Sequence, residues 1–434
     1  MKFIPTIIAA LMTLGAVAPQ AAAYDFMANG LAYRFNPDST TVTLTSTSRL
    51  SADNYSGLTA ALVPESVCDS DGIVYRVTAI DDFAFFGCST LQAVNIPESV
   101  KQIGDSALAY CPSLRSITVD VGNEVYDSRN SCNAVIRSSD NTLIAGCVPT
   151  TINLTIRAIG PYAFAGCADL ALMQLPSSMN TIGYEAFADC KKLISINLPS
   201  AVNEVGYRVF AGCDNLKIIT VASGNQRYDS RDDCNGVIET ATATLVAGCK
   251  ATVLPPSVSC IGYEAMSGCG ALTDYVVPET VTRIGHYAFA ATTDLTQVDL
   301  PSTITYFGDK AFGACTGLNT IYARLENPAQ AHYYNLSTFE GVDTLTTVVY
   351  VPDGTVDLYK ATMPWTPFFH IQPIPTIQLG DVNADGHVDI TDLNILINIV
   401  LGMDDPDNYE GRAYILGNDY VDVSDINALI NLML

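Results

Sequence analysis

The chain is poor in positive charge. Its 434 residues include 21 lysines and arginines against 45 aspartates and glutamates, for a formal net charge of −24. A surface of this sign repels the phosphates of nucleic acids and the head groups of anionic membranes, so neither is an expected partner. The charge is consistent with an exported protein whose acidic side chains are simply solvated.

Motifs of catalysis and metal binding are also scarce. Four histidines occur in the whole chain, and there is no Cys-x-x-Cys pair, nucleophile elbow, phosphate-binding loop or zinc motif. Asp274 and Asp299 are the one conceivable pair of nearby carboxylates. Because catalysis needs a nucleophile, a base or a metal held in a dry site, we expect a protein that is not an enzyme.

Long apolar runs are confined to the start of the chain. Lys2 precedes an apolar run from Phe3 to Val17, and Ala21-Ala22-Ala23 follows it. This pattern predicts a secretory signal peptide over residues 1–23, with cleavage before Tyr24 and no cysteine there for a lipid anchor. No later run is long enough for a membrane helix. We therefore expect an exported protein that is secreted or associated with the cell surface.

An internal repeat takes the place of such motifs. Eight units each begin with a large apolar residue, with successive spacings of 23, 56, 23, 23, 56, 23 and 23 in the numbering. Seven units have a cysteine eight positions later, Thr292 takes that position in the other, and a leucine follows three positions further on in all eight. Such a fixed period predicts a repeat solenoid of stacked units. The opening residues are Ile80, Ile103, Ile159, Ile182, Val205, Ile261, Ile284 and Phe307.

The pattern within a unit predicts its local structure. In residues 193–199, apolar and polar side chains alternate after the leucine, which indicates a strand with one buried face. Stacking the units places these strands in one parallel sheet. The stretch from Ile182 to Phe187 is predicted to return the chain along the opposite side as a short turn or helix, with Phe187 inside the core. Ile218 and Thr220, at outward strand positions, are candidate residues for contact with a partner.

Two units are longer than the rest. Each spacing of 56 is an ordinary spacing of 23 with an insert of 33, and the longer units occupy about residues 123–158 and 225–260. They are copies of one another, because Tyr126-Asp127-Ser128-Arg129 in the first recurs as Tyr228-Asp229-Ser230-Arg231 in the second. The array therefore has a second-order repeat.

The units resemble the BspA-like leucine-rich repeats of bacterial surface proteins, and the resemblance covers residues 77–323. It implies a leucine-rich-repeat solenoid, shaped as a curved and slightly irregular rod. It also implies adhesion, or recognition of a host or other extracellular protein or glycan. The alternative function is a structural spacer in a multi-protein extracellular complex.

Both ends of the array are predicted to be covered. Residues 24–76 indicate β-hairpins that form an N-terminal cap, with alternation over Thr41–Thr45 and a turn at Asp71-Gly72. Residues 324–371 resemble the closing unit of such arrays, where Trp365 is expected in the core rather than on a ligand platform. Residues 372–378 contain prolines and predict a linker.

Thirteen cysteines raise the question of disulfides in an exported protein. Stacked strands are about 4.8 Å apart, wider than the roughly 3.5–4.5 Å between the Cβ atoms of a relaxed disulfide. We therefore expect the repeated cysteines to be buried thiols that act as small apolar side chains. The pairs Cys132/Cys147 and Cys234/Cys249 are more open to bridging, although free thiols are favoured there too.

The tail contains a predicted calcium loop. Oxygen-bearing side chains stand at loop positions 1, 3, 5, 9 and 12, with Gly386 at position 6, and His387 offers its backbone carbonyl. Calcium takes six to eight hard oxygen ligands, and this spacing wraps a loop around one ion. The predicted ligands are Asp381, Asn383, Asp385, His387, Asp389 and Asp392.

The second half of the tail repeats the first, because the pattern of residues 389–394 recurs over residues 422–427. Each half has a loop followed by one helix, so residues 379–434 resemble a dockerin, a small α-helical module of EF-hand type that docks onto cohesin domains. The second loop departs from the family pattern, because Tyr414 and Leu416 stand at positions 1 and 3. A weak or empty second site remains, with Asn418, Asp422 and Asp425 as ligands.

The same resemblance implies where a partner would contact the tail. Family contacts lie at loop positions 10 and 11, which are Ile390 with Thr391 and Val423 with Ser424. A structural alternative is that Thr391 and Ser424 are N-caps of the two helices. A separate alternative for the function of the tail is a calcium-stabilised end domain without any cohesin partner.

Overall fold

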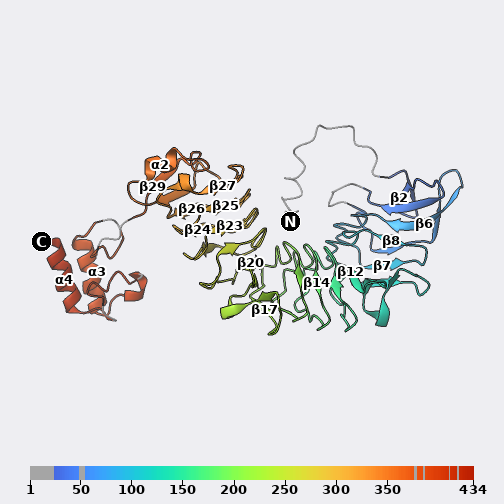
Figure 1. Cartoon of the computed structure of the whole chain (residues 1–434), viewed down its shortest axis with the longest axis horizontal. Coiled ribbons are helices and arrows are strands. Elements are labelled where there is room, and N and C mark those ends of the chain that lie inside the picture. The colour runs from blue at the N-terminus through green and yellow to red at the C-terminus, as the bar shows by residue number, and fades with distance from the viewer. Residues whose placement is uncertain (1–23, 48–53, 376–378, 385–386, 410, 418–419) are drawn as a thin grey trace.

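The computed structural model describes residues 24–47, 54–375, 379–384, 387–409, 411–417 and 420–434. From the N-terminal strands to residue 373, the chain forms a curved succession of strands and turns, and a helical tail follows it (Figure 1). The predicted signal peptide, residues 1–23, lies outside the described residues.

The N-terminal region is a sheet of antiparallel hairpins, as predicted. β1, β2 and β3 pair antiparallel, as do β5 and β6, and β3 then joins β6 in parallel. Gly72 takes a positive φ of 82° in the predicted turn between β5 and β6. The predicted alternation fails in β3, where Thr43 and Thr45 are also buried; their hydroxyls donate to Asn36 at 2.6 Å and to Asp81 at 3.2 Å. The strands are β1 (Phe26–Ala28), β2 (Leu31–Phe35), β3 (Thr41–Thr45), β5 (Ser66–Cys68), β6 (Val74–Ile80) and β8 (Gln102–Ile103).

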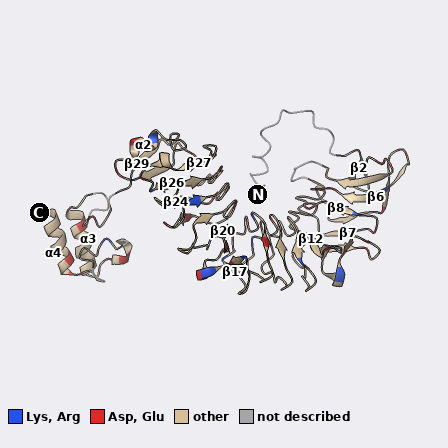
Figure 2. Cartoon of the chain, viewed as in Figure 1, with Lys and Arg blue, Asp and Glu red and all other residues tan. Residues whose placement is uncertain are grey.

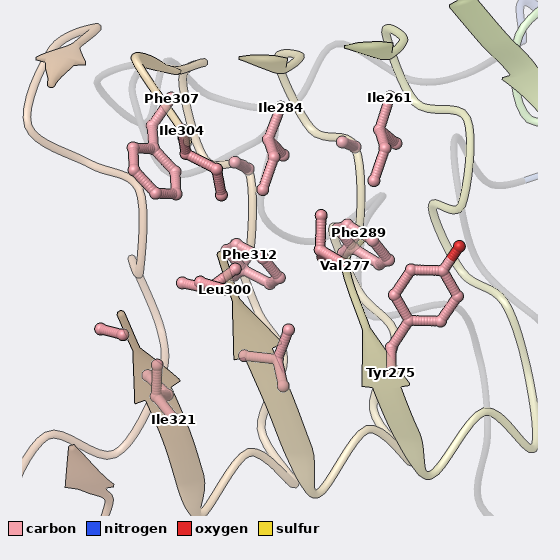
Figure 3. Packing of buried hydrophobic residues seen from close by; sticks show 14 of the residues in the cluster. Ile261, Tyr275, Val277, Ile284, Phe289, Leu300, Ile304, Phe307, Phe312 and Ile321 are labelled. Atoms are coloured by element: carbon pink, nitrogen blue, oxygen red, sulfur yellow. The ribbon is translucent and has the colours of Figure 1, made fainter. Parts of the chain in front are cut away.

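Most repeats contribute a short strand, a run of turns and a longer strand. In the repeat that begins at Ile159, the longer strand is reduced to one parallel bridge between Leu172 and Ser195. Figure 3 shows the short strands on one side, the longer strands on the other, and apolar side chains between them. The short strands are β13 (Ala158–Ile159), β14 (Thr181–Ile182), β16 (Glu204–Val205), β21 (Cys260–Ile261), β23 (Arg283–Ile284), β25 (Tyr306–Phe307) and β27 (His332–Tyr333). The longer strands are β4 (Ala60–Leu62), β7 (Ala93–Ile96), β9 (Ser116–Val119), β15 (Ser195–Leu198), β17 (Ile218–Val221), β22 (Asp274–Val276), β24 (Gln297–Leu300), β26 (Thr320–Ala323), β28 (Val348–Val351) and β29 (His370–Pro373).

We call the outward face of the longer strands the strand side. These strands do not form the single parallel sheet expected from the sequence. They form three sheets, β4-β7-β9, β15-β17 and β22-β24-β26-β28-β29. The buried apolar residues likewise form three main clusters along the array.

The two long units explain the interruptions. Within each long unit, the three strands pair antiparallel. The last of the three then pairs in parallel with the next short strand rather than with a longer strand. The strands are β10 (Tyr126–Asp127), β11 (Ala134–Arg137), β12 (Thr142–Gly146), β18 (Tyr228–Asp229), β19 (Val237–Glu239) and β20 (Thr244–Ala247). Short 3-10 helices occur at Arg129–Ser131, Arg231–Asp233 and Pro328–Gln330.

We call the turns between each short strand and the following leucine, for example residues 183–192, the turn side. Backbone amides here donate to carbonyls of the next unit, as from Gly166 to Ala188 at 2.8 Å. The amide of Tyr110 donates to Ala165 across the first long unit, and that of Gly212 donates to Gly268 across the second. The turn side is therefore continuous where the strand side is broken. The return segments are turns, so the alternative of a helix is not observed in the described repeats.

The repeated cysteines are buried free thiols, as expected, and they also donate hydrogen bonds. Sγ of Cys190, Cys213 and Cys315 lies 3.1–3.3 Å from a backbone carbonyl of the preceding unit. The hydroxyl of Thr292 makes the same bond to Met266 at 3.1 Å, which explains why threonine replaces cysteine there. All thirteen cysteines are free, so neither Cys132 and Cys147 nor Cys234 and Cys249 form a disulfide.

The last turns of the array bury Trp365, as predicted. Its side chain is 0% exposed, its ring lies against Phe339, and its indole N–H donates to the hydroxyl of Tyr333 at 2.9 Å. α2 (Val356–Lys360) lies between β28 and β29 in the chain. The tail then forms α3 (Ile390–Val400), a 3-10 helix (Pro406–Tyr409) and α4 (Val423–Met433) around a small core of its own.

Candidate binding surface and calcium loop

The strand side presents rows of outward side chains. Alternation buries Ile219 and leaves Ile218, 48% exposed, and Thr220 facing outward on β17, as predicted. The hydroxyl of Thr220 donates to the side chain of Asn197 on β15 at 2.9 Å. Thr118 donates to Asn95 in the same way at 2.8 Å in the first sheet. In these two sheets the outward positions thus form a row of hydrogen-bonded polar side chains.

The third sheet has a different outward row. The parallel register aligns Asp299, Tyr322 and Tyr350 on β24, β26 and β28. The rings of Tyr322 and Tyr350 stack with centroids 4.9 Å apart. Arg324 makes two hydrogen bonds to Asp299, both at 2.7 Å, and its guanidinium lies 5.9 Å from the centre of the Tyr322 ring. These tyrosines are not among the residues predicted from the sequence, although they occupy the outward positions that the strand alternation predicts.

The arrangement of acids in this sheet does not favour catalysis. Asp274 is in register with Gln297 rather than with Asp299, and Asp299 is paired with Arg324. The two carboxylates considered from the sequence therefore do not face one another as an acid–base pair.

The buried thiols have no nucleophilic character either. Burial raises the pKa of Cys167 and Cys315 to about 12, and that of Cys147 to about 11. The thiolate is the reactive form of cysteine, and it is scarce at neutral pH when the pKa is this high. These three cysteines therefore support the fold rather than chemistry.

One acid on the turn side has a pKa near neutrality. Burial raises the pKa of Glu264 to about 7, with Arg208 opposing the shift and Glu185 adding to it. Arg208 makes an ion pair with Glu185 at 2.7 Å and donates to Ser267 at 2.6 Å. These groups come from units on both sides of the second long unit. A perturbed pKa can mark a functional site, but this network also accounts for it structurally.

Charges elsewhere on the array are dispersed. Figure 2 shows lysines and arginines scattered along the described ribbon, and aspartates and glutamates on the tail helices. No helix among the described residues is long and apolar enough to cross a membrane.

Both tail helices begin with a capping box. Asp389 accepts from the amide of Thr391, while the carboxylate of Asp392 accepts from the amide of Asp389 at 2.9 Å. Asp422 and Asp425 repeat this arrangement at the start of α4. The alternative that Thr391 and Ser424 are the N-caps is therefore wrong. The aspartates precede them by two residues and point an acceptor at the free amides of the first turn.

The first loop provides a donor set that fits calcium. Asp381 and Asp392 are 2% and 0% exposed, and a buried carboxylate needs strong donors or a cation. Asp392 accepts from the amides of Val382, Asn383 and Asp389, which draws the loop around it. These carboxylates, Asn383 and the His387 carbonyl would hold the ion as hard oxygen ligands.

Asp385 and Gly386, at the middle of the loop, lie outside the described residues. Over the described ranges no group of three or more histidine, cysteine, aspartate or glutamate side chains is placed to hold a metal. Calcium binding therefore stays a prediction.

The second loop keeps only part of the pattern. Asp425 is 0% exposed and accepts from the amides of Leu416 and Asp422, which parallels Asp392. Asn418 lies outside the described residues, so the weak second site also stays a prediction. The four partner candidates of the tail, Ile390, Thr391, Val423 and Ser424, are all exposed.

Comparison with protein families identifies the repeats. The model described as "BspA type Leucine rich repeat region" matches residues 72–146, 145–232 and 246–357 in six copies, which is more than half of the chain. The tail lies outside these matches. The chain matches no curated protein.

Solved structures with similar repeats come from several bacteria. A leucine rich cell surface protein from Faecalibacterium prausnitzii is 20% identical, over 86% of this chain and 99% of that protein, with a TM-score of 0.43. A leucine-rich repeat protein from Bacteroides ovatus is 20% identical, over 82% and 78% of the two chains, with a TM-score of 0.32. The pneumococcal vaccine antigen PcpA is 15% identical, over 82% and 100%, with a TM-score of 0.39.

Proposed function

Because the chain belongs to the BspA-type leucine-rich repeat family, we propose that it is a non-catalytic, exported binding protein that recognises an extracellular protein or glycan. The strand side is the recognition surface. The observation that carries the proposal is the outward row of this side, which the core does not use. It changes from polar pairs such as Thr220 with Asn197 to the stacked Tyr322 and Tyr350 along the array.

The chemistry of this row suits recognition. Tyrosine offers a large, rigid contact area together with a hydroxyl, so it contributes strongly to many interfaces. The two hydrogen bonds between Arg324 and Asp299 hold the guanidinium close to Tyr322 before any ligand arrives. Such preorganisation lowers the entropy lost on binding.

The tail is the second part of the proposal. It binds calcium through Asp381, Asn383, Asp385, His387, Asp389 and Asp392, and attaches the protein to a cohesin-like partner. The duplicated capping boxes support a module built from two loop–helix halves. Ile390 and Val423 are each 58% exposed at equivalent places on the two helices, where a partner can reach them.

The strand side is tested with the immobilised full chain and a panel of extracellular glycoproteins and polysaccharides, measured by surface plasmon resonance. We expect at least one ligand, with binding reduced tenfold or more by Ile218→Asp, or by the pair Tyr322→Ala and Tyr350→Ala. Leu154→Ala, at an exposed side chain of the first long unit, is the matched control and should bind normally. Binding that none of the strand-side variants reduces contradicts a site on this side.

The tail is tested by calorimetric titration of the full chain with calcium. Asp381→Ala and Asp392→Ala should abolish the binding signal, whereas Asp404→Ala, in the tail but outside both loops, should retain it. A panel of cohesin domains is then added in calcium and in chelator. Calcium binding without any calcium-dependent cohesin binding would reject docking and leave the tail as a stabilised end of the rod.

A further inference from the structure

A groove of about 450 Å³ lies where the short strands are interrupted at the second long unit. β16 is the last strand of its sheet, and the next sheet begins with the long-unit strands β18, β19 and β20. The groove lies beside β16, and its lining includes Glu204, Tyr207, Arg227 and Tyr228. Its volume falls in the range of about 300–1,000 Å³ that is usual for small-ligand sites.

The backbone at this edge already has partners. The guanidinium of Arg227 donates to the carbonyl of Asn203 at 2.7 Å. The hydroxyl of Tyr228 is hydrogen-bonded to the backbone of Val205. The edge therefore offers little to an added peptide strand, which binds through main-chain hydrogen bonds. Recognition in the groove falls to side chains.

The side chains of the groove combine aromatic rings with planar polar groups. Tyr207 is 51% exposed, and its ring lies against Tyr263 with centroids 4.6 Å apart. The guanidinium of Arg227 lies 5.3 Å from the centre of the Tyr228 ring, and it makes an ion pair with Glu239 at 3.0 Å. Tyr207 is thus the ring that a ligand can reach, whereas Tyr228, only 4% exposed, lies beneath Arg227.

The charge of the groove selects against anions. Arg227 is its one cation among the lining residues, and it is paired with Glu239, while Glu204 adds a further carboxylate. The whole chain carries a net charge of −24. A phosphate, sulfate or uronate would therefore meet an uncompensated negative field.

We propose that this groove binds a neutral sugar unit of an extended glycan. The apolar face of a pyranose ring packs against an aromatic ring, and its hydroxyls pair with carboxylate, guanidinium and carbonyl groups, which are the groups present here. The proposal rests on the recognition role of the repeats but adds a site away from the strand side. It also names the class of ligand.

The first long unit provides an internal control. It is a copy of the second, and it keeps Tyr126 at the position of Tyr228. Asp105 stands in place of Tyr207, and Val125 stands in place of Arg227. The corresponding place therefore lacks the exposed ring, and its guanidinium comes instead from Arg137, which stands at the position of Glu239 and pairs with Asp140. Without the ring, we expect no sugar binding there.

The test is native electrophoresis of the full chain through gels that contain laminarin, xylan, mannan or galactan, with alginate as the anionic comparison. We expect a neutral polysaccharide to retard the wild-type chain. The pair Tyr207→Asp and Arg227→Val, which introduces the residues of the first long unit, should weaken retardation at least tenfold. Tyr207→Phe should preserve it, because the ring remains. Asp105→Asn should leave it unchanged.

The outcomes separate the groove from the strand side. Retardation that the groove variants lose and Ile218→Asp keeps supports the groove. Loss in Ile218→Asp alone overturns the groove while it supports the strand side. No retardation by any neutral polysaccharide, or retardation by alginate only, overturns the proposal. Melting curves show whether each variant is folded. Tyr207→Phe still gives a result if the double variant does not fold.

Discussion

The turn side and the strand side belong to the same repeats, yet only the turn side continues past the long units. The amides of Tyr110 and Gly212 reach the next unit across the whole of an intervening long unit. The strand side splits into three sheets at the same places. The cost of closing a longer loop grows only slowly with its length, so a unit can accept an insert while its turn keeps register with the next.

This difference indicates how the array divides its tasks. The turn side holds the stack together through a repeated hydrogen-bond ladder and a row of buried phenylalanines. The side chains that vary from unit to unit lie on the strand side and in the two long units that interrupt its sheets. Substitutions on the two sides should therefore have different consequences, and five experiments test this.

The largest effect is expected for the phenylalanine stack. Phe187 is 0% exposed and lies between Phe164 and Phe210, with centroids 5.4 and 6.2 Å away. Phe187→Ala should lower the free energy of unfolding by about 3–5 kcal/mol. Ile218→Ala, on the strand side, should change it by less than about 0.5 kcal/mol. Urea unfolding followed by circular dichroism measures both, and equal losses would refute the comparison.

The next largest effect is expected at Arg208. Its ion pair with Glu185 has side-chain exposures of only 11% and 10%. Arg208→Met leaves Glu185 as a buried charge without its cation and should cost about 3 kcal/mol. Combining it with Glu185→Gln should recover part of the loss. Lys101→Met breaks an exposed pair with Glu124 and should cost less than about 1 kcal/mol. Thermal unfolding distinguishes these cases.

A smaller effect depends on pH through Glu264. Burial raises its pKa from 4.5 to about 7, so the folded protein holds this proton more tightly than the unfolded chain does. Stability should therefore be highest below pH 4.5 for this group and fall as the pH rises to about 7. Allowing for the partial exposure of Glu264, we expect a loss of about 1–2 kcal/mol. In Glu264→Gln, the fall in melting temperature between pH 5 and 8 that this group causes should be absent. The same fall in the variant as in the wild-type chain would contradict the role of Glu264.

A modest gain is expected at Ala314. It has a φ of 56°, whereas Gly166 and Gly212 take positive φ at the equivalent place of their units. The left-handed conformation costs a residue with a Cβ about 1–2 kcal/mol, which exceeds the entropic disadvantage of glycine. Ala314→Gly should therefore raise stability by about 0.5 kcal/mol. Ala290→Gly, at a buried position without positive φ, should lower it.

The smallest change is expected from the most drastic alteration. Deleting residues 223–255 removes the insert and restores the ordinary repeat spacing between Val205 and Ile261. The turn ladder from Gly212 to Gly268 can stay as it is. We expect a folded protein with β17 next to β22 and a melting temperature within about 0.5 °C of the original, which for a chain of this length corresponds to less than roughly 0.5 kcal/mol. An unfolded product would show that the long unit is required for the stack.

Much of the fold follows from local patterns. The strand alternation correctly places Ile219 inside and Thr220 outside, and the aromatic closing segment correctly predicts a buried Trp365. Ile219 and Thr220 follow the period of two of a strand, and Trp365 closes the end of the stack. Both signals are visible in the sequence. The N-cap assignment failed at Thr391 because Asp389 and Thr391 are both good caps, and local sequence does not choose between them.

The sequence alone determined the solenoid, its regular repeat unit and the buried cysteine position, because each turn of the stack repeats the same requirement for packing. It also determined the oxygen-rich loop of the tail, whose calcium binding is still a prediction. Only the tertiary structure decided that the strand side breaks while the turn side continues. It also brought together Tyr207 with Tyr263 and Glu185 with Arg208. Such contacts depend on how units stack across a long insert, and no local pattern encodes that geometry.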